Sequence, residues 1–155
     1  MLLMVTLLGC LFRHGQLTPR EEGQFRAGDL GEGWEWVQPG GADQAWYNPS
    51  ILGSIYADSN CKHRHDDSTL VDSMRHLTAG LSPEAPQREE VFRLDGREAL
   101  MQVMDVSLDG VDVRMGAVVL NKDHCTYDLV YLAPVNRFED GWSDFVAMVS
   151  GFGVY

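Results

Sequence analysis

The fold is decided by residues 111–119, which read VDVRMGAVV. Apolar side chains recur there at every second position, namely Val111, Val113, Met115, Ala117 and Val119. A period of two is the pattern of a β-strand that buries one of its faces. The stretch therefore predicts a long strand, and the neighbouring segments are expected to pair with it.

Turn signals on both sides of this strand predict an antiparallel meander in the C-terminal half of the chain. The Asp-Gly pair at 109–110 is typical of two-residue hairpin turns, and an expected strand over 97–107 precedes it. Residues 121–124 turn the chain back into an expected strand over 125–131. A short strand at 91–92, closed by a second Asp-Gly pair, is expected to begin the meander.

Two helices are expected beside these strands. The first has Asp67 and Ser68 as N-cap candidates and ends at Gly80, and the second has Asp140 as a candidate cap and ends at Gly151. Their apolar residues recur at helical spacing: Leu70, Val71, Met74 and Leu77 in the first, and Phe138, Trp142, Phe145, Val146 and Val149 in the second. Further strands are expected at 34–37, 45–47 and 53–57. The sequence therefore predicts one α+β domain over 34–155, an antiparallel sheet flanked by two main helices.

The order of these elements resembles the Mog1/PsbP-like fold, in which helices flank a curved antiparallel sheet. The likeness lies in the turn over 95–99, which reads DGREA, and in the final strand followed by a C-terminal helix. It covers about residues 33–152. Members of that fold include a Ran-binding protein, a photosystem II extrinsic subunit and bacterial lipoproteins. The resemblance implies attachment to a larger assembly rather than catalysis, and it assigns no site residue.

The N-terminus indicates export and lipid anchoring. Residues 1–9 are mostly apolar and too few to span a bilayer, and Leu7-Leu8-Gly9-Cys10 resembles the lipobox of bacterial lipoproteins. We therefore expect a signal peptide over 1–9, an acylated Cys10 and a Gly-rich flexible tether over 10–33. No basic residue precedes Arg13, which favours a truncated signal. One alternative is that these first residues form a buried strand with Cys10 in the core. The other is that the start of the sequence is an artefact.

The two other cysteines predict a disulfide. Cys61 follows one expected strand and Cys125 begins another, and an exported protein meets an oxidising environment. A bridge between them would contribute up to about 4 kcal/mol in the loop-entropy model. The alternative is a pair of unpaired buried thiols.

A metal site is the competing interpretation of the same region. Cys61, His63 and His65 stand at alternate positions, so in extended chain they would leave the same face, and His124 with Cys125 could complete a site. Sulfur and imidazole ligands suit zinc or copper. A cysteine that is oxidised cannot ligate a metal, so this weaker alternative excludes the disulfide.

The net charge and the absence of enzyme motifs disfavour several classes of function. The chain of 155 residues has a formal net charge of −11, which disfavours nucleic acid and anionic lipid as partners. It contains no phosphate-binding glycine loop, no Gly-x-Ser-x-Gly and no His-Glu-x-x-His. The sequence therefore predicts no enzyme and no cofactor.

Aromatic residues near the N-terminal strands suggest a partner surface instead. Trp36, Trp46 and Tyr47 exceed what one small core needs, and interfaces concentrate such side chains. We therefore predict a non-catalytic envelope lipoprotein that binds a protein partner as an accessory subunit of a membrane-associated complex. It would face the periplasm, with the outer membrane favoured. The alternatives are a carrier with an apolar cleft for a lipid or small molecule, and the metal-binding protein described above.

Overall fold

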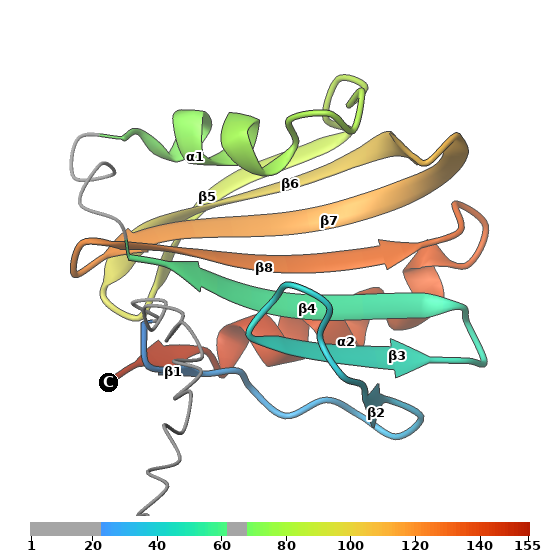
Figure 1. The fold of residues 1–155 in the computed structure, drawn as a ribbon, viewed down its shortest axis with the longest axis horizontal. Coiled ribbons are helices and arrows are strands. Elements are labelled where there is room, and N and C mark those ends of the chain that lie inside the picture. The colour runs from blue at the N-terminus through green and yellow to red at the C-terminus, as the bar shows by residue number, and fades with distance from the viewer. Residues whose placement is uncertain (1–22, 62–67) are drawn as a thin grey trace, which may run out of the picture.

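The structure is a computed structural model that describes residues 23–61 and 68–155. Its main element is a seven-stranded antiparallel sheet in the order β2-β3-β4-β8-β7-β6-β5 (Figure 1). The strands are β2 (Glu35–Trp36), β3 (Gln44–Asn48), β4 (Gly53–Asn60), β5 (Arg88–Leu94), β6 (Arg97–Leu108), β7 (Val111–Lys122) and β8 (Cys125–Ala133). With helices α1 (Leu70–Leu77) and α2 (Phe138–Ser150), the fold is α+β, as predicted.

Tight turns connect the four strands of the predicted meander, β5 to β8. Each turn has two central residues with positive φ: 47° and 80° at 95–96, 51° and 80° at 109–110, and 51° and 65° at 123–124. Positive φ at both positions defines the hairpin turn whose twist matches that of the strands. The turns hold successive strands in register, with Leu108 opposite Val111 and Lys122 opposite Cys125.

Helix α2 packs on one face of the sheet and closes the larger core. Phe138, Phe145 and Met148 are fully buried against side chains of β4, β6, β7 and β8. Two glycines allow this close contact: a Cβ on Gly116 would collide with the ring of Trp142, and one on Gly141 would collide with the hydroxyl of Tyr131. Figure 1 shows α2 behind the sheet.

Helix α1 covers only part of the opposite face. Its Met74 is buried with apolar residues of β6, β7 and β8, whereas β3 lies beyond its reach (Figure 1). The burial of β4 reflects this difference, because residues 53, 55, 57 and 59 are buried on the α2 side and the residues between them stay half-buried. One half of the sheet therefore has a face that no described helix covers.

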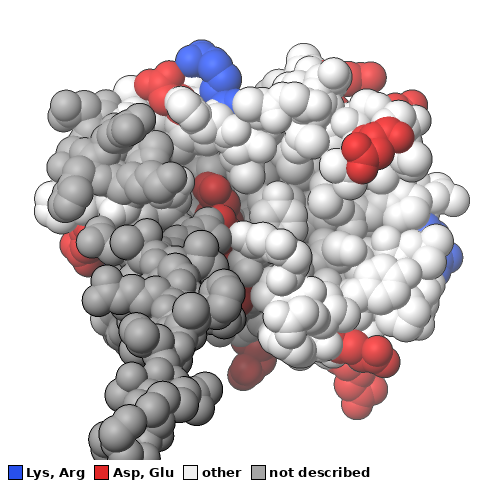
Figure 2. Space-filling model, viewed as in Figure 1, with Lys and Arg blue, Asp and Glu red and all other residues white. Residues whose placement is uncertain are grey.

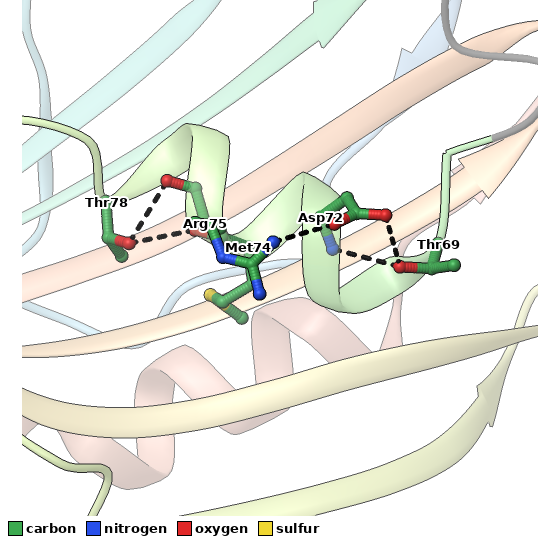
Figure 3. A network of polar contacts seen from close by, with 5 residues as sticks. All are labelled: Thr69, Asp72, Met74, Arg75 and Thr78. Atoms are coloured by element: carbon green, nitrogen blue, oxygen red, sulfur yellow. Dashed lines mark hydrogen bonds and ion pairs between the residues drawn. The ribbon is translucent and has the colours of Figure 1, made fainter.

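The N-terminus of α1 differs in detail from the prediction. Thr69 is the N-cap, one residue after Ser68: its Oγ1 accepts a hydrogen bond from the Asp72 backbone N–H at 3.1 Å and donates one to Asp72 Oδ2 at 2.8 Å. Figure 3 shows this exchange together with the ion pair from Asp72 to Arg75. The predicted Asp67 lies outside the described residues. A Thr followed three residues later by an acid is a capping pair, and it fixes the residue at which α1 begins.

The cap of α2 also differs from the prediction. Arg137 is the N-cap residue and makes no side-chain capping hydrogen bond, while Asp140 lies inside the first turn. An acidic side chain there still interacts favourably with the positive end of the helix dipole. Gly151 ends the helix as predicted.

The segment predicted as a flexible tether is packed where the structure describes it. Phe25 is buried against the rings of Tyr127 and Phe152, and β1 (Phe25–Arg26) pairs with β9 (Gly153–Val154). The Gly28 N–H donates to the Met148 carbonyl oxygen at 2.9 Å. The packed domain thus includes residues 23–33, so the predicted boundary at residue 34 is too late. Within residues 23–61 and 68–155, neither helix has the length and apolar character of a membrane span.

Candidate functional site

The predicted aromatic residues lie on different faces of the sheet. Trp36 pairs with Trp46, and Trp46 pairs with Ile55, so all three side chains lie on the α2 side. Along this row the exposed fraction falls from 60% at Trp36 to 0% at Ile55. Trp46 packs partly against the core that α2 closes. Trp36 is thus an exposed extension of that core at the edge of the sheet.

Tyr47 belongs to the opposite face. Successive residues of a strand point to opposite sides, and Tyr47 pairs with Ser54, which in turn pairs with Leu132. The structure therefore does not bring the predicted set of Trp36, Trp46 and Tyr47 together. It separates an edge tryptophan from a tyrosine on the uncovered half of the sheet.

We call this uncovered half the open face, and define it by Ala45, Tyr47, Ser54, Tyr56 and Leu132. All five side chains are half-buried and uncharged. Figure 2 shows uncharged side chains filling the centre of this view, with most charged groups towards its margin. The chain carries 23 acidic and 12 basic residues, so an uncharged centre is a marked local departure from its composition.

A polar hollow, here called the acidic pocket, lies between α1 and one end of the open face. Its volume is about 250 Å³, and its lining residues are Asn60, Ser68, Ser73, His76, Leu77, Thr126 and Asp128. Strands β4 and β8 supply its floor and α1 supplies a wall. Acidic atoms are visible in a hollow on this side of the molecule (Figure 2).

Two aspartates stand directly opposite each other beside this pocket. Asp58 of β4 pairs with Asp128 of β8, and both lie on the α1 side. Burial, and secondarily the charge of Asp58, raise the pKa of Asp128 to about 7. Burial and the same two acids raise the pKa of Tyr56 to about 12. Asp128 Oδ1 is buried without a hydrogen-bond partner in the structure, which is rare for a carboxylate oxygen.

Asn121 organises the hydroxyl groups of the pocket. Its Oδ1 accepts hydrogen bonds from Ser73 Oγ at 3.2 Å and from Thr126 Oγ1 at 2.9 Å. Its Nδ2 donates to the Ser68 carbonyl oxygen at 3.0 Å. A carbonyl oxygen can only accept, so this last contact fixes which amide atom faces which neighbour. The network links α1 to β7 and β8 behind the pocket.

The predicted disulfide is present at the same end of the sheet. The Sγ atoms of Cys61 and Cys125 are 2.05 Å apart, next to the pair formed by Asn60 and Thr126. The bond removes the Cys61 thiolate that the metal hypothesis requires. The other two residues of that hypothesis, His63 and His65, lie outside the described residues, as does the predicted acylation site Cys10. In the part of the chain that the structure describes, no three carboxylate, imidazole or thiol groups cluster as metal ligands.

A second hollow lies on the other face, between α2 and strands β5 and β6. Its volume is about 300 Å³, and its lining is mainly apolar: Glu90, Phe92, Met101, Trp142, Phe145, Val146, Val149 and Ser150. Arg88 lies over the Trp142 ring, with its guanidinium carbon 5.6 Å from the ring centre. This apolar groove is the feature that the carrier hypothesis requires, although its volume is at the small end of ligand sites.

Sequence reasoning missed the acid pair. Asp58 lies one residue beyond the segment expected as a strand, and Asp128 reads as the polar half of an alternating strand. Their pairing depends on the register of two strands that are distant in sequence, which neither local pattern contains.

Comparison with known proteins gives the fold and no family. No protein-family model matches the chain, and no curated protein matches it. Among solved structures, LpqN, involved in cell envelope biogenesis of Mycobacterium tuberculosis, is 12% identical with a TM-score of 0.59, over 91% of this chain and 87% of LpqN. The cyanobacterial PsbP (CyanoP) of Synechocystis sp. PCC 6803 is 16% identical with a TM-score of 0.58, over 95% of this chain and 100% of CyanoP. These similarities confirm the predicted Mog1/PsbP-like fold.

Proposed function

We propose that this protein is a non-catalytic accessory module of the bacterial cell envelope, and that the open face binds a protein partner. The observation that carries the proposal is a sheet face on which Tyr47 of β3 is half-buried beyond the reach of α1, while Tyr56 and Leu132 lie at the border of the cluster that α1 closes. Tyrosine is enriched in interfaces and charge is depleted at their centres. A surface of this composition in a strongly acidic chain suits a protein partner.

Three observations support the envelope as its location. LpqN, which has the same fold, is involved in cell envelope biogenesis. The disulfide between Cys61 and Cys125 suits an oxidising compartment such as the periplasm. The sequence around Cys10 resembles a lipobox. In this proposal an acyl chain on Cys10 anchors the domain to the membrane on the periplasmic side, with the outer membrane favoured.

Site-specific photocrosslinking in the host cell tests the docking surface. A photoreactive phenylalanine analogue at Tyr47 should give a discrete adduct with one protein. The same analogue at Val71, which is 55% exposed on α1, is the control and should give none. Adducts at both positions, or at Val71 alone, would contradict docking on the open face.

A lipid or small-molecule carrier is the second candidate, because the apolar groove beside α2 exists. Replacing Val146, which lines the groove and is 40% exposed, with Trp should fill it. Native mass spectrometry of the protein purified from its host should then show a bound apolar molecule in the wild type and none in Val146→Trp. A wild type that carries no such molecule removes the support for a carrier.

A further inference from the structure

Three of the residues that line the acidic pocket offer only hydrogen-bond acceptors to a ligand, whereas Asn60, Ser68 and His76 also carry donors. The hydroxyl hydrogens of Ser73 and Thr126 both point to Asn121 Oδ1, so only the lone pairs of these two oxygens remain for other contacts. Asp128 adds a carboxylate with one buried, unpartnered oxygen. These three groups line the same hollow, so a ligand that contacts all three must supply several hydrogen-bond donors.

The size of the pocket limits what can enter. Its volume of about 250 Å³ is below the roughly 300–1,000 Å³ typical of sites that hold a whole small molecule. It suits one functional group at the end of a chain. A hard divalent cation prefers six or more oxygen ligands, and among the described residues no three carboxylate, imidazole or thiol groups have the arrangement of metal ligands.

We propose that the acidic pocket binds the primary ammonium group of a lysine side chain. An ammonium has three N–H donors and no acceptor, which matches Ser73 Oγ, Thr126 Oγ1 and the Asp128 carboxylate. The four-carbon stem of lysine would lead out over the open face. The inference rests on the proposed function in one respect only, since it places this lysine on the docking partner.

The charges around the pocket favour lysine over a lipid headgroup. Phosphoethanolamine also carries a primary ammonium, but its phosphate follows two carbons later and would lie near Asp58 and Asp128. Like charges at such separation repel each other. A lysine side chain carries no negative group within reach of the pair.

The protonation state of Asp128 determines how the binding of an ammonium group should depend on pH. Only the ionised form of Asp128 attracts an ammonium, and the pKa of this buried acid is raised to about 7. The other titratable groups around Asp128 are its cross-strand neighbour Asp58, His76 on α1 and the Tyr56 phenol, whose pKa is about 12. Binding should therefore strengthen from pH 6 to pH 8 and lower the pKa of Asp128.

NMR titration of the whole oxidised chain tests the inference without a partner protein. The probe is Nα-acetyl-lysinamide, and the readouts are the backbone amide shifts of Ser73 and Thr126 and the carboxyl carbon shift of Asp128. The probe should shift all three signals saturably and lower the pKa of Asp128. Tetramethylammonium, which has the charge without N–H donors, should not. No saturable shift, or an equal effect of tetramethylammonium, would overturn the proposal.

Two further probes and two variants complete the design. If calcium chloride alone shifted these signals more than Nα-acetyl-lysinamide does, the lysine assignment would be overturned in favour of a metal. A larger effect of phosphoethanolamine would overturn it in favour of a lipid headgroup. Asp128→Asn should weaken probe binding at least about tenfold, since a charge-assisted contact is lost. Asp112→Asn removes the same charge from an exposed strand position and should bind as the wild type does. Failure of the lysine probe would overturn this inference alone, because docking is tested by crosslinking at Tyr47.

Discussion

Replacing Asp128 with Asn should change how the stability of the protein depends on pH. The folded-state pKa of Asp128 is about 7, against an ordinary value of 3.8, and burial is the main cause. The folded protein thus holds a proton that the unfolded chain releases between pH 4 and pH 7. Stability rises with pH only where the unfolded state binds more protons, so here it must fall as pH rises through this window.

The size of the effect follows from the shift. One pKa unit corresponds to about 1.4 kcal/mol, so a shift from 3.8 to about 7 gives a loss of about 4 kcal/mol between pH 4 and pH 8. Asparagine has a similar shape and no charge. The free energies of unfolding of the two proteins should therefore agree near pH 4, and Asp128→Asn should be about 4 kcal/mol more stable at pH 8. For a chain of this length that is roughly 10 °C in Tm.

Thermal and urea denaturation at intervals from pH 4 to pH 8 measure this difference. Hydrogen bonds from Lys122 and Arg114 lower the pKa values of Asp95 and Asp105, and their stabilising effect is lost only as pH falls below about 4. They act equally in both proteins, so the difference between the profiles isolates position 128. Asp112→Asn controls for the general loss of an acidic charge. Parallel profiles for wild type and Asp128→Asn from pH 4 to pH 8 would show that Asp128 does not have a raised pKa in the folded protein.

Three other changes should separate structural from functional roles. Trp36→Ala should alter the free energy of unfolding by less than about 0.5 kcal/mol, whereas Trp46→Ala should cost about 2 kcal/mol or more in urea denaturation, because only the second packs on the core. Equal losses would contradict this difference in packing. Replacing Cys61 and Cys125 with Ala should cost about 4 kcal/mol, since the bridge closes a separation of 64 residues; an unchanged Tm would contradict that role. Cys10→Ser should move the protein from the membrane pellet to the soluble exported fraction. A Cys10→Ser variant that still sediments with membranes would contradict a lipid anchor at Cys10.

The strands of the meander could be read from the sequence because their signals are local. Alternating apolar residues over 111–119 and three tight turns each carry their own physical cause. The same alternation also implies that Trp46 and Tyr47, as neighbours in one strand, point to opposite faces. The three predicted partner-binding residues, Trp36, Trp46 and Tyr47, are therefore divided between the two faces, and Trp36 is the exposed one of the first pair.

Other features depend on contacts between distant segments. Phe25 is an isolated aromatic residue in a Gly-rich stretch, and only its packing against Tyr127 and Phe152 shows that this stretch is part of the domain. Asp58 and Asp128 become a pair only through the register of β4 and β8. Local composition predicts a tether in the first case and two solvated acids in the second. Both features follow from tertiary structure.

A charge placed on the open face tests whether this face binds the partner protein. Tyr47→Arg puts a cation in the uncharged centre of that face, and Val71→Arg puts the same charge on the exposed side of α1. Each protein would be isolated from detergent-solubilised membranes of its host after its Tm has been checked. We expect the protein crosslinked at Tyr47 in the wild type to co-purify with Val71→Arg and to be lost from Tyr47→Arg. Retention of that partner by a folded Tyr47→Arg protein would show that the open face is not the docking surface.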